Sequence, residues 1–267
     1  MGNELKGRIL HCDANCLVVN KMAGEAVEGA GKGMVDLPKL LAEQMPSLGL
    51  PPALPEQDAL ALPVAVHRLD VPVSGCAVFA RTENALRFLN DAFRNEAVEK
   101  RYWAIIEQPP ENNACKWLEN PSSEFTEIVH WLQFNAQKNK SFAHDEQGGG
   151  RKKAVLRCRL AGRGRDYLFL ELVLVTGRHH QIRAQFEKLG LHIKGDLKYG
   201  ARRSEKDGGI CLHARLLSFP RMADSSGSPP GVPKITVQAD PPVINNLWQA
   251  FITAAGESSP HLTIFPK

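Results

Sequence analysis

The feature that most constrains this chain is residues 64–79, where two apolar runs of strand length flank a loop that holds a histidine, an arginine and a carboxylate. Pro72 and Gly75 punctuate the loop as a turn, and such a loop presents Asp70 at the end of a buried strand. A carboxylate so close to apolar sequence is costly to bury unless a cation or hydrogen-bond donors hold it ionised. Arg68 is poorly placed for this, so we expect a partner from elsewhere in the chain. Taken by itself, the stretch is equally consistent with Asp70 as a turn cap.

The composition is that of a globular protein that can bury a large core. The 267 residues are 43% hydrophobic, which suits one large domain or two small ones. The formal charge of +4 permits a nucleic-acid partner without demanding one. No apolar run approaches the roughly 18 residues of a membrane span, and residues 1–6 lack the layout of a signal peptide. We therefore expect a cytoplasmic protein without membrane contact, which we take to be a monomer.

Apolar periodicity and turn signals predict strands and helices in alternation along the chain. Strands are expected at residues 9–10, 17–19, 98–106, 128–134, 154–160, 167–175, 210–219 and 235–239, and helices at 37–45, 82–95, 176–190 and after 241–242. Alternation over residues 98–106 places Tyr102 on the same face as Lys100. Thr82 should cap its helix, which bears one apolar face. Together these elements imply a mixed α/β or α+β sheet protein.

Residues 176–183 are predicted to open a helix directly after a strand, and they are dense with hydrogen-bond donors. Backbone amides, the positive end of the helix dipole and two arginines, Arg178 and Arg183, gather there. This combination favours an anion site.

No residue pattern in the chain indicates a metal or redox site. The six cysteines are scattered without the paired spacing of zinc or redox motifs, and we interpret them as reduced packing residues. His179, His180 and His192 are the histidines to weigh as metal ligands. Adjacent histidines, however, point to different faces of a helix, and no carboxylate is suitably spaced. The sequence therefore predicts no metal.

Three separated segments carry the groups capable of chemistry, at residues 67–70, 100–102 and 176–183. In this order they closely resemble the RluA-type family of RNA pseudouridine synthases. Further similarity lies at residues 18–21, 193–196, 199–200 and 212–214, so that the resemblance covers about residues 9–240. No one of these segments is as specific as the set.

The resemblance implies a fold as well as an activity. The expected class is α+β, a pseudouridine synthase-like mixed, mainly antiparallel β-sheet flanked by helices, with a central catalytic cleft. We expect residues 1–267 to form a single catalytic domain without the N-terminal S4-type RNA-binding domain of many relatives, because strand-like sequence already begins at Ile9. The catalytic domain would then recognise RNA unaided.

The activity implied by the resemblance is a cofactor-free isomerisation of uridine in ribosomal or transfer RNA, in which the base is detached from its sugar, turned and rejoined through carbon. By the resemblance, Asp70 is the essential aspartate, Tyr102 stacks on the target base, and Arg183 pairs with the aspartate. Arg183 would be the missing partner of Asp70, holding it in a two-pronged pair. Whether Asp70 attacks as a nucleophile or removes a sugar proton stays open.

The remaining site residues are expected to bind substrate. They are His67, Arg68, Leu69, Arg178, His180, Gln181 and Leu212. The resemblance implies that Arg68 lies near the phosphate of the flipped nucleotide and Leu212 near the wall of the site. Which RNA and which uridine are modified is left open.

Two alternatives compete with this interpretation. The first is a catalytically inactive RNA-binding protein of the same fold, against which the presence of Asp70, Tyr102 and Arg183 argues. The second is a hydrolase that uses Asp70 with His67 or His180. It is the weaker one, because no serine or cysteine nucleophile lies in a recognisable elbow.

Two further segments are predicted as surface loops. Residues 138–153 contain three consecutive glycines and the basic side chains of Lys138, Lys140, Arg151, Lys152 and Lys153. We expect a mobile basic loop there, and whether it contacts RNA or is merely a solvated surface stays open. The second surface loop is expected at residues 225–233.

Overall fold

The computed structural model of the protein describes residues 4–53, 58–222, 233–241 and 245–256. Within these residues, eleven strands form one sheet. They are β1 (Ile9–Cys12), β2 (Cys16–Lys21), β5 (Ala59–Ala65), β6 (Ser74–Thr82), β7 (Glu99–Glu107), β8 (Thr126–Asn135), β9 (Lys140–His144), β10 (Lys152–Arg163), β11 (Tyr167–Leu174), β12 (Leu212–Pro220) and β13 (Lys234–Gln238). The short strands β3 (Glu25–Ala26) and β4 (Val35–Asp36) pair apart from this sheet.

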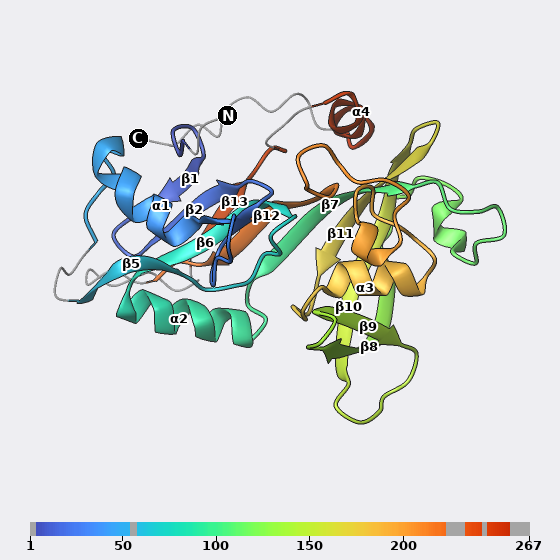
Figure 1. Cartoon of the computed structure of the whole chain (residues 1–267), viewed down its shortest axis with the longest axis horizontal. Coiled ribbons are helices and arrows are strands. Elements are labelled where there is room, and N and C mark those ends of the chain that lie inside the picture. The colour runs from blue at the N-terminus through green and yellow to red at the C-terminus, as the bar shows by residue number, and fades with distance from the viewer. Residues whose placement is uncertain (1–3, 54–57, 223–232, 242–244, 257–267) are drawn as a thin grey trace.

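The described helices are α1 (Leu37–Gln44), α2 (Glu83–Arg94), α3 (Gln181–Lys188) and α4 (Asn246–Ala254), with short 3-10 helices η1 (Met45–Leu48), η3 (Lys116–Leu118) and η4 (Leu197–Tyr199). The strand order across the sheet is β1-β2-β6-β12-β7-β11-β10-β8-β9, with β5 beside β6 and β13 beside β12. In the described chain, neighbouring strands of this sheet run antiparallel except β6 and β12, which are parallel. Figure 1 shows β7 running between a half that carries α1 and α2 and a half that carries α3. The expected α+β class, with a mixed and mainly antiparallel sheet flanked by helices, is confirmed.

The largest apolar core joins both halves of the molecule. It unites Phe79 of β6, Tyr102 of β7, Leu170 of β11 and Phe186 of α3 in one cluster of buried side chains. Burial of apolar surface on this scale is the main force that holds the sheet and α3 together. Because Tyr102 belongs to this cluster, the site described below is built on the packed centre of the fold.

Helix α2 begins and ends where the sequence predicts. The Thr82 hydroxyl accepts a hydrogen bond from the Ala85 amide at 3.2 Å, and Asn95 follows the last turn. Such a cap satisfies one of the amides that the first turn of a helix leaves without a partner. The apolar face of α2 packs against side chains of β6, β12 and β13, which fixes the position of Phe93 near the helix end.

Residues 64–79 differ from expectation in two ways. The strand before the loop, β5, is only partly buried and ends at Ala65, so Asp70 lies within a loop rather than at the end of a buried strand. The fully buried strand is β6, which follows the loop. Gly75 is part of β6 and pairs with Ala214 of β12. With a φ of +115°, a Cβ atom on Gly75 would overlap the Ala214 backbone, so the close approach of the two strands requires glycine there.

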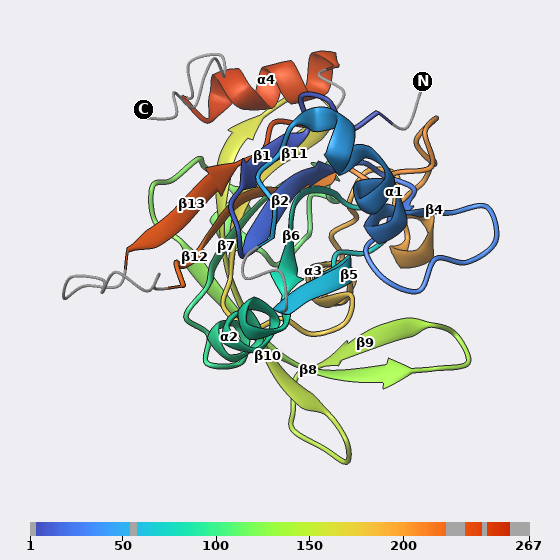
Figure 2. The ribbon, with the colours of Figure 1, turned by 90° about the vertical axis from the view of Figure 1, so that its left-hand side faces the viewer.

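The prediction of a mobile loop is wrong for much of residues 138–153. Strand β9 begins at Lys140 and β10 at Lys152, and β8 and β9 form a hairpin that Figure 2 shows extending away from the rest of the ribbon. The Lys140 ammonium lies 2.7 Å from the Glu187 carboxylate of α3 and donates to the Lys198 carbonyl at 2.8 Å. Charged composition hides the strand here, because Ser141, a polar residue, is the one that points inward.

The predicted loop at residues 225–233 lies almost wholly outside the described residues. All six cysteines are free. Among the helices that the structure describes, none has both the length and the apolar character needed to cross a membrane.

Candidate active site

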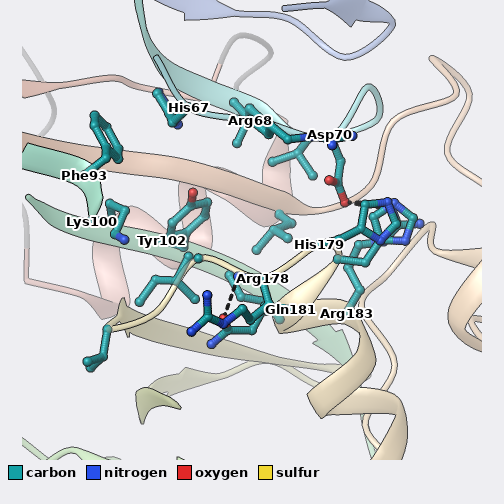
Figure 3. A pocket seen from close by; sticks show the side chains of 18 of the residues that line it. His67, Arg68, Asp70, Phe93, Lys100, Tyr102, Arg178, His179, Gln181 and Arg183 are labelled. Carbon is teal, nitrogen blue, oxygen red and sulfur yellow. Dashed lines mark hydrogen bonds and ion pairs between the residues drawn. The ribbon is translucent and has the colours of Figure 1, made fainter. Parts of the chain in front are cut away.

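A pocket of about 500 Å³ opens where the loop after β5, strand β7 and the turn before α3 meet. This volume lies within the range of about 300–1,000 Å³ that is usual for ligand pockets. All ten residues that the sequence predicts for the site line it, and Figure 3 shows those of them that it labels around one space. They are His67, Arg68, Leu69, Asp70, Tyr102, Arg178, His180, Gln181, Arg183 and Leu212.

Asp70 contributes its backbone and its side chain to different parts of the structure. Its carbonyl accepts a hydrogen bond from the Val73 amide at 2.9 Å, which closes the turn. Its carboxylate instead points to the Nη1 atom of Arg183, at 2.9 Å, and lies 3.5 Å from the Nε2 atom of His180. The side chain is 21% exposed, so a ligand in the pocket can reach it. The carboxylate is therefore held by a cation from α3 rather than used as a turn cap.

Arg183 binds two carboxylates. Its two-pronged pair is formed with Asp196 and not, as the sequence suggested, with Asp70. Its Nε and Nη2 atoms donate to the two carboxylate oxygens of Asp196 at 2.7 Å and 2.8 Å, which leaves only Nη1 for Asp70. Burial lowers the pKa of Arg183, but the hydrogen bonds and charges of Asp196 and Asp70 outweigh it and raise the pKa above its usual value. The two-pronged pair thus orients the guanidinium, and the single bond presents it to Asp70.

Asp196 and Tyr199 were not assigned any role from the sequence. The Asp196 side chain is 1% exposed, and the guanidinium of Arg183 lies 4.8 Å from the centre of the Tyr199 ring. The sequence indicated a second acceptor for Arg183 only through its chemistry, because a buried arginine carries five donors and needs more than one acceptor. The residues around position 196 were noted for their similarity to the family, but that similarity does not indicate which carboxylate takes the fork.

His180 reaches Asp70 because its backbone is in a left-handed conformation. Its φ is +50°, an uncommon value for a residue other than glycine, and α3 begins only at the next residue. The ring lies 2.9 Å from the Tyr199 hydroxyl through Nδ1 and stacks on His179 with ring centres 3.8 Å apart. The two histidines therefore lie side by side, and the expectation that they point to different faces of a helix is wrong. They precede the helix.

The protonation of His180 follows from its surroundings. Burial lowers its pKa to about 3, and the charge of Asp70 opposes this shift without reversing it. The imidazole is thus neutral at pH 7, and the nearby carboxylate favours the tautomer that carries the proton on Nε2. Neutral His180 then adds a weak second donor beside Arg183.

Tyr102 forms one wall of the pocket from strand β7. The side chain is buried, and Figure 3 shows its ring between Asp70 and Lys100. Burial raises its pKa, with a smaller contribution from the charge of Asp70, so the hydroxyl stays protonated. The strand alternation predicted from the sequence is confirmed, because Lys100 and Tyr102 both line the pocket.

The loop residues before Asp70 have separate contacts. The Nε2 atom of His67 accepts a hydrogen bond from the Val78 amide at 3.2 Å, and its ring stacks on Phe93. Arg68 is largely exposed and pairs with Glu28 at 3.2 Å, so it does not neutralise Asp70. Leu69 is a buried residue of the core. Of these three, Arg68 has the side chain most accessible to a ligand.

Gln181 connects the parts of the turn before α3. Its Oε1 atom accepts hydrogen bonds from the Arg178 amide at 2.9 Å and the Thr176 hydroxyl at 2.8 Å, and its Nε2 atom donates to the Val155 carbonyl at 3.1 Å. Both ends of the amide are therefore used by the protein. Gln181 shapes the turn that positions His180 at the pocket.

Lys21 binds the backbone of the Asp70 loop and, although it lies in one of the segments that resemble the family, was not assigned a role from the sequence. It is fully buried, and its ammonium donates to the carbonyls of Val71 at 3.0 Å and Val73 at 2.6 Å. Charge-assisted hydrogen bonds of this kind restrict the loop on both sides of Pro72. Lys21 thus helps to hold the backbone that carries Asp70.

One group of side chains with metal-binding atoms occurs among the described residues, outside the pocket. It consists of His11, Asp13 and Cys16, at the turn between β1 and β2. The Asp13 carboxylate already accepts the amides of Asn15 and Cys16, and the Arg81 guanidinium lies against the same turn. These contacts stabilise the turn, and a neighbouring cation is unfavourable for a metal ion.

Comparisons with known proteins agree on one family. A family model described as RNA pseudouridylate synthase matches residues 15–188. An uncharacterised RNA pseudouridine synthase of Zymomonas mobilis is 30% identical over 220 residues, which cover 82% of this chain and 90% of that protein. Ribosomal large subunit pseudouridine synthase C of Vibrio parahaemolyticus is 26% identical over 81% of this chain. The chain spans 62% of the length of the Vibrio protein.

Solved structures show the same fold. The human protein named RNA pseudouridylate synthase domain containing 4 superposes with a TM-score of 0.63 over 96% of each chain, at 20% identity. Its relative named domain containing 1 gives a TM-score of 0.62 over 98% of this chain, also at 20% identity. At this level of identity the likeness concerns the fold.

Proposed function

Because this chain belongs to the RNA pseudouridylate synthase family and is an RNA pseudouridine synthase, we propose that the pocket around Asp70 is its active site and that its substrates are uridines of ribosomal or transfer RNA. The observation that carries the proposal is the carboxylate of Asp70, partly exposed to the pocket and bound by Arg183. No finding favours the catalytically inactive alternative.

In the proposed reaction, Asp70 acts on the sugar of the target nucleotide. The bond between the sugar and N1 of uracil breaks, the base turns, and a bond from the same sugar carbon to C5 forms, while one proton leaves C5 and one is gained at N1. Atoms and electrons balance within one nucleotide. Arg183 supplies the positive charge and the hydrogen bond that favour the ionised, oriented carboxylate.

Tyr102 is proposed to stack on the target base. Chemistry at the sugar–base bond requires the nucleotide to leave its stack, which costs a few kcal/mol. An aromatic face recovers part of this cost, and stacking of a base on an aromatic side chain contributes about 1–3 kcal/mol. The hydroxyl of Tyr102 stays protonated in this pocket, so a charged phenolate does not face Asp70.

The proposal extends to the setting in which the enzyme works. All ten proposed site residues come from one chain, which supports a monomer as the active form. Ribosomal or transfer RNA as the substrate supports a cytoplasmic location, because these RNAs are used there.

The test compares cells that lack the protein with cells that regain either the wild-type chain or Asp70→Asn. Mapping of pseudouridine in total RNA should show at least one position that disappears without the protein, returns with the wild type and stays absent with Asp70→Asn. The purified variant should keep its thermal melting temperature and its affinity for RNA, because asparagine preserves volume and polarity. Asp166→Asn, an exposed aspartate on the surface, serves as the matched control and should restore modification. Restoration by Asp70→Asn would refute the assignment of Asp70.

A further inference from the structure

The pocket has two ends, and the reaction proposed above uses only one of them. Figure 3 shows Asp70, His179 and Arg183 at one end and Phe93 and Lys100 at the other, with Tyr102 between. Arg178 and Glu96 line the pocket together with Lys100, and both lie close enough for their charges to act on its ammonium. This end has no task in the chemistry at the sugar.

Lys100 is a buried cation without a partner in the part of the chain that the structure describes. The side chain is 7% exposed, on the same face of β7 as Tyr102, and no hydrogen bond or ion pair within this part of the chain reaches its ammonium. The ammonium lies close to Gly177 of the turn before α3, since a Cβ atom on Gly177 would be in ordinary van der Waals contact with Nζ at 3.8 Å. Burial lowers the pKa of Lys100, an effect that the charge of Glu96 opposes and that of Arg178 increases. An ammonium held in this way is costly unless a ligand supplies a compensating charge.

The charged groups around Lys100 do not supply this compensating negative charge. Arg178 donates from Nε to the Lys153 carbonyl at 3.0 Å, and among the described residues no carboxylate forms an ion pair with it. Arg94, at the rim, is already paired with Asp91. Glu96 acts on Lys100 only through its charge, without an ion pair. Two cations thus share one end of the pocket, which favours an anion between them.

We propose that Lys100 and Arg178 form a subsite for a backbone phosphodiester of the RNA next to the target uridine. The inference rests on the proposed function, because the RNA strand is what brings the anion to the pocket. A phosphodiester carries a full negative charge, whereas the carbonyl groups of uracil are neutral and do not compensate a buried ammonium. The subsite holds the backbone while the uridine is placed between Tyr102 and Asp70.

The experiment uses the full chain and a short labelled oligouridylate in which each phosphodiester is replaced in turn by a neutral methylphosphonate. Fluorescence anisotropy then gives the affinity for each oligonucleotide. For the wild type, replacement at one position should lower the affinity about tenfold, which is the effect expected for the loss of one charge-assisted contact. Lys100→Met should lower the affinity for the unmodified oligonucleotide to a similar extent. In this variant the methylphosphonate at that position should have no further effect, because the ammonium that contacts the phosphate is absent.

Two further variants make the result specific. Lys39→Met removes the same charge from an exposed position on α1 and should keep the wild-type pattern at every phosphate. Arg178→Gln should lose sensitivity to the methylphosphonate at the same position at which Lys100→Met loses it. Without RNA, Lys100→Met should melt at a higher temperature than the wild type, because an uncompensated buried charge is removed, so a loss of binding by this variant cannot come from unfolding.

Several outcomes would overturn the subsite. A wild type that fails to bind the oligouridylate, or that is equally sensitive at all phosphates, would exclude a specific subsite. A Lys100→Met variant that keeps the wild-type pattern would do the same. So would an Arg178→Gln variant that loses sensitivity at a different phosphate from Lys100→Met. If Lys100→Met weakens the binding of uridine as much as that of its 5′- and 3′-monophosphates, the ammonium contacts the base instead. Failure of the proposed function has a different signature, since it appears as modification by Asp70→Asn and not in these affinities.

Discussion

At the scale of single residues, Arg183 decides how two carboxylates are used. Its fork is bound to buried Asp196, and the remaining nitrogen is bound to Asp70. Asp196 therefore acts through Arg183 as a positioning residue, without a place in the lining of the pocket. This division could not be predicted from the pairing of Asp70 with Arg183, because both aspartates suit an arginine equally well as residue types.

We expect Asp196→Asn to lower both stability and activity. The substitution leaves Arg183 buried with one charged partner instead of two, and breaking a buried pair costs about 3 kcal/mol. Urea unfolding measures the first effect. Single-turnover kinetics should show a slower chemical step with unchanged RNA affinity, since the guanidinium is no longer held toward Asp70. Asp166→Asn is the control, and an Asp196→Asn enzyme with the wild-type rate would contradict the positioning role.

For Tyr102 we expect the ring and the hydroxyl to have separable effects. Tyr102→Phe keeps the aromatic face, so RNA affinity should change little while turnover falls. Tyr102→Ala removes the stacking surface and should weaken binding about tenfold or more, in line with a stacking contribution of about 1–3 kcal/mol per base. Binding and turnover measured side by side for both variants provide the test. Equal turnover of Tyr102→Ala and the wild type would reduce Tyr102 to a core residue.

At the scale of elements, the parallel contact of β6 and β12 begins at Ser74, directly after the Asp70 loop in the chain. His213 of β12 is fully buried there, and its Nε2 atom donates to the Ala239 carbonyl at 2.9 Å. Its Nδ1 atom, at 2.9 Å from the Ser74 hydroxyl, is left to accept. The neutral ring thus satisfies both bonds and joins β6, β12 and the end of β13.

This arrangement predicts a loss of stability in mild acid. Burial lowers the pKa of His213 to about 4, with a smaller opposing effect from the bond to Ala239. In the unfolded chain the ring takes up a proton near pH 6.5, while the folded protein resists it until about pH 4, so stability falls as pH drops through this window. The contribution of His213 to this loss at pH 5 is about 2 kcal/mol.

Urea unfolding at pH 7, 6 and 5 tests the effect on the wild type and His213→Gln. The variant should be less stable at pH 7, because a hydrogen bond is removed or distorted, but its stability should depend less on pH. Parallel pH profiles for the two proteins would show that His213 does not titrate in this window.

The elements that the sequence predicts well are those with local signals. Thr82 caps α2 from one residue before it, as predicted. The two faces predicted for β7 are also correct, because Tyr102, Ala104 and Ile106 pack into one core whereas Trp103 and Ile105 pack into another. The prediction for residues 138–153 failed because strand β9 has an unusual pattern, in which Ser141 is the buried residue and its neighbours Lys140 and Phe142 are less buried. The prediction for the turn before α3 was wrong for another reason. A left-handed His180 lies outside what helix signals can indicate.

At the scale of the whole molecule, the β8–β9 hairpin and the start of β10, which pairs with β8, carry several basic side chains. Lys138, Lys152 and Lys153 are exposed, whereas Lys140 is bound to Glu187 of α3. The two alternatives for this segment, an RNA contact or a solvated surface, therefore apply only to the exposed cations. Lys140 holds the hairpin against α3.

We expect the two kinds of lysine to differ in the salt dependence of RNA binding. Replacing Lys138, Lys152 and Lys153 together by glutamine should make the slope of log affinity against log salt shallower, by about 0.7–0.9 for each phosphate that is no longer neutralised. Lys140→Gln should leave the slope nearly unchanged and lower the melting temperature instead. Affinities at several salt concentrations measure this, and an unchanged slope for the triple variant would show a merely solvated surface.

The sequence by itself determined the parts of this protein that depend on neighbours along the chain. These are the two faces of β7, the cap of α2 by Thr82 and the three segments that carry Asp70, Tyr102 and Arg183, whose resemblance to one family the comparisons confirm. Only the tertiary structure decided that the fork of Arg183 binds Asp196 and that Lys100 has no partner among the described residues. The reason is physical. A charge pairs with whichever acceptor the sheet and α3 bring within hydrogen-bond distance, and that distance depends on the packing of segments far apart in the chain.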